Sequence, residues 1–135
     1  MKIVNHTNLP DEYLTAIVKT LTRGITRRFQ EIVFSYTKRT AYHANIKHWF
    51  SMVIHVAIAK QESGFYPINM NERRNLHFNF PKYEVNNEEE LALCLLAHEI
   101  YHAKANIHHW KSTEKRAEAY AFKILTRVRG VNENA

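Results

Sequence analysis

The chain has 135 residues, of which 45% are hydrophobic and 24% are charged, a length and composition that predict one globular domain spanning residues 1–135. No apolar run approaches the length of a membrane span, and the first residues lack the continuous apolar segment of a signal peptide. The single cysteine, Cys94, excludes an intramolecular disulfide framework and fits a reducing compartment. We therefore expect a cytoplasmic protein that makes no contact with a membrane.

The formal net charge of +6 leaves two interpretations of the basic residues. They could form a surface that attracts nucleic acid or another polyanion. They are also scattered along the chain, with no dense basic arm and no helix-turn-helix or zinc-finger pattern, as expected of solvated helix faces. The scattered distribution favours solvated faces and leaves contact with a polyanion as the alternative.

The first predicted element is a helix over residues 8–24. Asn8 can cap it, Pro10 falls in its first turn, and Gly24 is a natural stop. Apolar residues recur at helical spacing and form one buried stripe: Leu14, Ile17, Val18 and Leu21. The helix therefore has a face with which to cover the rest of the domain.

Four of the following segments are predicted to be strands. Residues 31–37 and 51–59 alternate between apolar and polar side chains and are rich in β-forming residues. Residues 64–70 and 75–80 have the same character, and Pro81 ends the last strand and suggests a sheet edge. Residues 38–50 are ambiguous.

Two helices are predicted to finish the chain. Asn87 can cap the first helix, which would run to residue 105 or 106. Ser112 or Thr113 would open the second, which would run to about residue 129, before Gly130. The order of a helix, a small sheet of three or four strands and two helices predicts an α+β fold.

The first of these two helices contains the pattern H-E-x-x-H, as "HEIYH". Its histidines, His98 and His102, are four residues apart and lie on one helix face, where two imidazoles can bind one Zn²⁺. Glu99 would then act as the general base for a water that attacks a peptide carbonyl. Because residues 91–97 are nearly all apolar, polar groups buried here need a compensating partner. A hydrogen-bonded cluster without a metal is the alternative.

A catalytic zinc ion usually has three protein ligands, and the sequence offers two candidates for the third. With His108, the histidine spacing resembles that of the metzincin proteases and of the YbeY-type endoribonucleases. However, Ala105 stands where metzincins place a turn-forming glycine, and no methionine follows Met70. Glu114 and Glu118 share one stripe of the last helix with core residues, so they are expected to face inward. We favour Glu114, and His108 stays open as its rival.

The two helices together resemble the gluzincin clan of metallopeptidases, in particular the ImmA/IrrE-type peptidases and the single-domain minigluzincins. That clan pairs H-E-x-x-H with E-x-x-A-D or a close variant on the next helix, and "EKRAEAYAFKIL" is similar to this second motif. The resemblance covers roughly residues 87–130. It implies a minimal zincin-like fold in which zinc is held by His98, His102 and Glu114. It also implies that Glu99 is the general base, and that Glu118, one methylene longer than the usual aspartate, orients a ligand histidine.

The resemblance also implies a substrate-binding strand. The clan binds extended substrate along an edge strand that precedes the active helix, which here would be residues 75–80, with a contact from His77. The expected function is therefore zinc-dependent hydrolysis of peptide bonds in peptides or proteins. Two alternatives stay open. One is a metal-dependent nucleic-acid hydrolase, or a nucleic-acid-binding protein, with three histidine ligands. The other is a regulatory protein that binds zinc without turnover.

Overall fold

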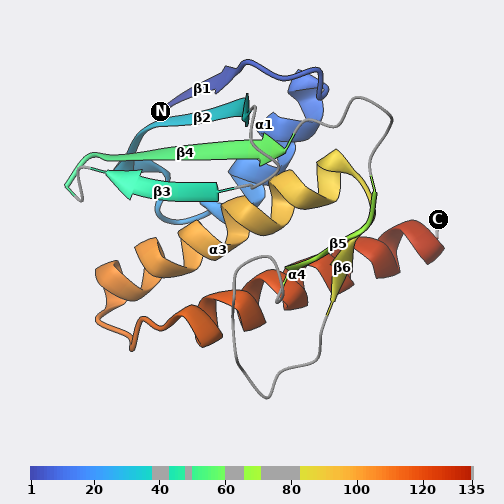
Figure 1. Cartoon of the computed structure of the whole chain (residues 1–135). Coiled ribbons are helices and arrows are strands. Elements are labelled where there is room, and N and C mark those ends of the chain that lie inside the picture. The colour runs from blue at the N-terminus through green and yellow to red at the C-terminus, as the bar shows by residue number, and fades with distance from the viewer. Residues whose placement is uncertain (38–42, 48–49, 60–65, 71–82, 135) are drawn as a thin grey trace.

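The computed structural model describes residues 1–37, 43–47, 50–59, 66–70 and 83–134 (Figure 1). In these residues the chain forms an α+β fold. The strands are β1 (Lys2–Asn5), β2 (Phe29–Thr37), β3 (His43–Lys47), β4 (Met52–Ala59), β5 (Ile68–Asn69) and β6 (Glu84–Val85). The helices are α1 (Asp11–Leu21), α3 (Glu88–His108) and α4 (Glu114–Asn134), with a short 3-10 helix at Thr26–Arg28.

Four of the strands form one mixed sheet in the order β1-β2-β4-β3. β1, β2 and β4 are parallel, and β3 pairs antiparallel with β4 at the edge. The predicted alternation in residues 51–59 is confirmed, because the apolar side chains of one face of β4 are all fully buried: Met52, Ile54, Val56 and Ile58. The sheet therefore presents one apolar face to the helices.

The helices cover that face in two layers. α1 and α3 pack against the sheet, and α4 packs against α3 (Figure 1). The predicted stripe of α1, from Leu14 to Leu21, is buried in the same core as the inward side of β4. Residues 91–97 of α3 are buried on every side, because this helix lies between the sheet, α1 and α4. The continuous apolar run that opens α3 reflects this central position.

The first residues differ from the prediction. Residues 2–5 form β1, a strand that sequence patterning missed because it is only four residues long. α1 begins at Asp11 with Pro10 in the cap position, so the prediction that Asn8 caps the helix is wrong. Asn5 orders the preceding turn instead, with its side-chain amide donating to Leu9 O and its Oδ1 accepting from Thr7 N, each at 2.8 Å.

The last helices are longer than predicted. α3 continues to His108 and ends at His109, which adopts a left-handed conformation with φ 57°. α4 passes through Gly130 to Asn134, so the predicted stop at Gly130 is wrong. A glycine weakens a helix by about 1 kcal/mol but ends it only where the chain adopts a capping conformation, and Gly130 has no positive φ. The predicted cap at Asn87 is confirmed, because its side chain accepts from Glu90 N, and of the two candidates Ser112 and Thr113 it is Thr113 that accepts from Arg116 N.

Between β4 and α3 the described chain is less regular than predicted. The expected strand over residues 64–70 is described from residue 66 on, and within this part Ile68 and Asn69 are in a sheet, paired with Val85 and Glu84. The expected strand at residues 75–80 lies outside the described residues. No helix in the described part of the chain is long and apolar enough to cross a membrane.

A cluster around Glu90 joins the start of α3 to the end of α4. The Arg129 guanidinium donates to both Glu90 carboxylate oxygens at 2.8 Å, and Asn86 N donates to the same carboxylate at 2.9 Å. These contacts hold the pKa of the Glu90 carboxyl below its usual value, with Arg129 as the largest cause. The cluster thus favours the ionised carboxylate in the folded protein.

We expect Glu90→Gln to lower the free energy of unfolding by about 1–2 kcal/mol at neutral pH, because a partly buried charge-assisted pair is weakened. Since the folded-state pKa is lowered, this stability is present above the unfolded pKa and is lost as pH falls through the folded pKa. Urea unfolding at neutral and acidic pH measures the difference. Glu89→Gln is the matched control, because Glu89 is in the same helical turn but its side chain is exposed. Equal destabilisation by both variants would contradict this account.

Candidate metal centre

α3 brings two histidines to the interface with α4. The Asn87 cap and the apolar run fix the helix against the sheet, and His98 and His102 follow on one face, one turn apart. His98 is 2% exposed, whereas the His102 side chain is 16% exposed. The pair therefore lies where the buried part of the helix gives way to its accessible end.

A tight connection brings the next helix back onto this face. His109 turns the chain in the left-handed conformation, and Trp110 N donates to Ala105 O at 2.8 Å, which closes the end of α3. Thr113 then caps α4, whose first residue is Glu114. The reversal takes only residues 109–113, so Glu114 returns to the level of the histidines.

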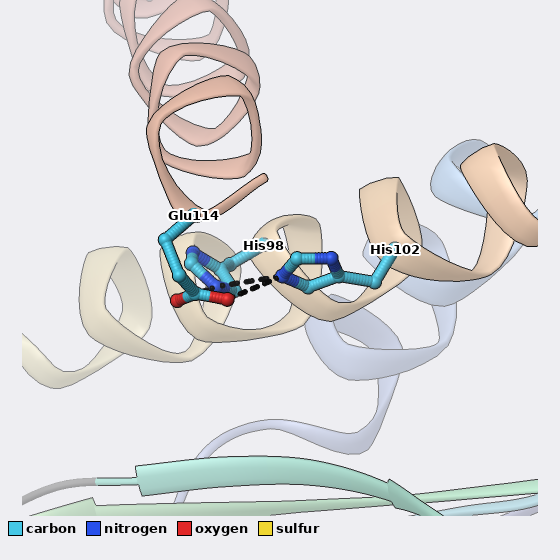
Figure 2. A group of neighbouring side chains, drawn as sticks. All are labelled: His98, His102 and Glu114. Atoms are coloured by element: carbon cyan, nitrogen blue, oxygen red, sulfur yellow. Dashed lines mark hydrogen bonds and ion pairs between the residues drawn. The ribbon is translucent and has the colours of Figure 1, made fainter. Parts of the chain in front are cut away.

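The three side chains meet between the two helices, as Figure 2 shows. Glu114 Oε2 lies 3.0 Å from His98 Nε2, and Glu114 Oε1 lies 2.8 Å from His102 Nε2. The two Nε2 atoms are 3.2 Å apart. Each residue therefore directs one ligand atom to a common point, and these atoms all lie within 4.8 Å of one another.

This geometry fits a divalent metal ion. Ligand atoms on a tetrahedral zinc ion, with bonds of 2.0–2.1 Å, are about 3.3 Å apart. The two imidazole nitrogens are 3.2 Å apart, and each lies 2.8–3.0 Å from one of the two Glu114 oxygens, so these separations are near that value. His98, His102 and Glu114 could thus hold a metal ion.

The other nitrogen of each ring has a polar partner. His98 Nδ1 lies 2.5 Å from Glu118 Oε1, and His102 Nδ1 lies 2.6 Å from Ser112 Oγ. A carboxylate only accepts, so in the tautomer of His98 that donates from Nδ1 to Glu118 the Nε2 lone pair is directed to the common point. This tautomer can bind a metal through Nε2. Histidines that bind metals commonly donate their other ring N–H to a carboxylate, which fixes the orientation of the ring.

Glu118 is itself held by a residue from a distant segment. Its side chain is fully buried, and Tyr83 Oη donates to its Oε2 at 2.7 Å. The Tyr83 ring packs against Phe122 of α4, with centroids 5.2 Å apart. The arrangement forms a continuous buried chain of hydrogen bonds from Tyr83 through Glu118 to His98.

The remaining predicted residues lie around this group or outside the described chain. Glu99, beside His98, is 9% exposed and is not one of the three grouped residues. His108 is exposed and stacks on Trp110, with ring centroids 4.9 Å apart, and the structure does not bring it to His98 and His102. His77 lies outside the described residues.

Two residues of the site were not predicted from sequence. Tyr83 precedes α3 and is 35 positions from Glu118, so no local spacing connects them. Ser112 was expected only to open the last helix, but Thr113 caps it, and Ser112 contacts His102 instead. The short connection between the two helices was the only sequence feature that could have indicated this contact, because it keeps Ser112 close to the end of the helix that contains His102.

A comparison with protein-family models, with curated proteins and with solved structures finds no match to this chain. The resemblance to gluzincins therefore depends on the two helix motifs alone. The structure adds that the motif of α3 and the first residue of α4 converge on one point.

Proposed function

We propose that this protein is a zinc-dependent peptidase of the gluzincin type. The observation that carries the proposal is the convergence of two imidazole nitrogens and one carboxylate from consecutive helices. Glu99 follows His98 directly in the H-E-x-x-H pattern of α3. Two histidines and a glutamate are a common ligand set of catalytic zinc. With three protein ligands, a fourth coordination position is left for the reaction.

The residues of the chain have separate roles in this proposal. Zinc, when bound, would polarise the substrate carbonyl and lower the pKa of a water molecule. Glu99 accepts the proton of the attacking water and passes it to the leaving amine. Glu118 and Ser112 fix the orientation of the His98 and His102 rings through their Nδ1 atoms. Because His98 and Glu118 are buried, their interaction is shielded from water.

The sheet offers a site for an extended substrate. β3 pairs with β4 on one side, and no other described strand lies on its second side. α3 packs against both strands, so this edge belongs to the same unit as the proposed catalytic helix. A peptide that adds to a sheet edge gains backbone hydrogen bonds, which supports hydrolysis of extended polypeptide rather than of folded protein.

Peptide hydrolysis is tested directly with a mixed peptide library and mass spectrometry of the products. We expect cleavage that stops when a chelator removes the metal and returns when Zn²⁺ is added. Folding of the metal-free protein is checked by circular dichroism, so that loss of activity is not confused with unfolding. Bound zinc with no cleavage of any library peptide would leave a zinc-binding protein and contradict the peptidase proposal.

Tyr83→Phe is expected to weaken Zn²⁺ binding by about tenfold. Removing a residue that supports a metal ligand through hydrogen bonds typically lowers metal affinity by about 10–100-fold. The ring and its packing on Phe122 are retained, while the hydrogen bond to Glu118 is lost. Competition with a zinc-sensitive dye measures the affinity. Tyr120→Phe is the matched control, since the Tyr120 hydroxyl contacts Lys104. Unchanged affinity in Tyr83→Phe would contradict the role of this hydrogen bond.

A further inference from the structure

Acidic side chains gather at one end of the fold. The start of α1, the start of α3 and the end of β2 meet there, since Tyr13 Oη donates to Glu89 O at 2.8 Å and Tyr36 Oη donates to Glu88 at 2.9 Å. The acidic residues at this end are Asp11, Glu12, Glu84, Glu88, Glu89 and Glu90. The last turn of α3 and the first turn of α4 lie at the opposite end (Figure 1).

The end that contains the metal centre has the opposite charge. Between Ile100 and Ala119, around the turn from α3 to α4, the chain has four basic side chains and two acidic ones. Those two, Glu114 and Glu118, both contact the histidines. The basic side chains of this stretch therefore outnumber its carboxylates, which gives the turn from α3 to α4 a net positive charge.

Two open hollows flank the connection between α3 and α4. His102 and Trp110 line one of them, with a volume of about 490 Å³. Lys111, Lys115 and Arg116 line the other, with a volume of about 530 Å³, which we call the basic hollow. The basic hollow lies close to the metal centre, because two of its lining residues, Thr113 and Lys115, are the sequence neighbours of Glu114.

We propose that the basic hollow binds an acidic side chain of the substrate, so that the peptidase selects polypeptides with glutamate or aspartate near the scissile bond. This inference rests on the proposed function. In the described part of the chain, Lys111, Lys115 and Arg116 make no ion pair. Three cations without an ion pair in one hollow are complementary in sign to carboxylates and attract acidic chains to the centre.

An acidic peptide fits this surface better than a nucleic acid does. Proteins that bind single strands without sequence preference use a long cationic groove that follows many phosphates. Here the three cations lie in one hollow beside a group whose ligand set suits peptide hydrolysis. Binding of a nucleic acid in the basic hollow is therefore the competing possibility, and a single-stranded oligonucleotide is included in the test.

The test is fluorescence anisotropy with Zn²⁺-saturated Glu99→Gln protein, which binds peptide without rapid cleavage. The probes are a fluorescein-labelled peptide of alternating glutamate and alanine and its glutamine–alanine counterpart. The test variant adds three substitutions in the basic hollow: Lys111→Ala, Lys115→Ala and Arg116→Ala. The control variant removes the same charge from exposed positions elsewhere: Lys19→Ala, Lys123→Ala and Arg127→Ala.

We expect the glutamate peptide to bind about tenfold more tightly than the glutamine peptide, and salt to reduce the difference. The test variant should lose this preference, whereas the control variant should keep it. Equal binding of both peptides, or equal loss in both variants, would overturn the proposal. The proposal would also be overturned if an oligothymidylate strand bound far more tightly than the glutamate peptide and lost this binding in the test variant. Cleavage of neutral and acidic library peptides at equal rates would refute the selectivity while leaving the peptidase function intact.

Discussion

Glu114→Ala is expected to weaken Zn²⁺ binding by more than about 10²-fold, so that the purified variant contains almost no metal. The carboxylate is one of three ligands in the proposed site. Removing a residue that only hydrogen-bonds a metal ligand already lowers metal affinity by about 10–100-fold, so removing a ligand should cost more. His108→Ala is expected to retain near-stoichiometric zinc, because His108 stacks on Trp110 away from the group. Elemental analysis of the two variants beside the wild type measures the difference.

The comparison of these two variants separates the rival ligand sets. Glu114 is 57% exposed, so its replacement by alanine removes little buried surface and the variant should fold normally. Thermal unfolding of both metal-free variants provides the control. Zinc lost in His108→Ala and retained in Glu114→Ala would contradict the gluzincin arrangement and favour the site with three histidines.

Glu99→Gln is expected to reduce peptide hydrolysis by about 10²–10⁴-fold, the usual contribution of a general base. Zinc content should stay near that of the wild type, because Glu99 is not among the three grouped residues. Cleavage of a library peptide and elemental analysis of the same preparation measure both quantities. The glutamine has nearly the same volume as the glutamate it replaces, which limits disturbance of this 9% exposed position.

The pair of measurements on Glu99→Gln distinguishes two explanations of lost activity. Activity lost with zinc retained supports a role for Glu99 in proton transfer. Activity lost together with zinc would instead indicate that the carboxylate helps to hold the metal. Full activity would exclude Glu99 as the base and with it the mechanism proposed above.

Part of the site could be predicted because its geometry is local. The spacing of His98 and His102 on one helix places their side chains together in any fold that keeps the helix. The inward stripe of the last helix is also a local property, and Glu118 and Leu125 on it are fully buried. The role of Glu114 as a ligand is still a prediction, although the structure places its carboxylate beside both imidazoles.

What could not be predicted depends on contacts between distant segments. Tyr83 reaches Glu118 only because the segment before α3 lies against α4. β1 pairs with β2 across α1, and its four residues carry too few alternations to be recognised alone. The stop expected at Gly130 failed because a glycine ends a helix through its backbone conformation, which composition does not reveal.

The most direct test of the account is a crystal structure of the protein purified with Zn²⁺, with anomalous data collected above and below the zinc absorption edge. We predict one zinc peak, bounded by His98 Nε2, His102 Nε2 and the Glu114 carboxylate at about 2.0–2.2 Å. A zinc peak at His108 without Glu114, or no ordered zinc at a saturating concentration, would contradict the central claim that α3 and α4 together form a catalytic metal centre.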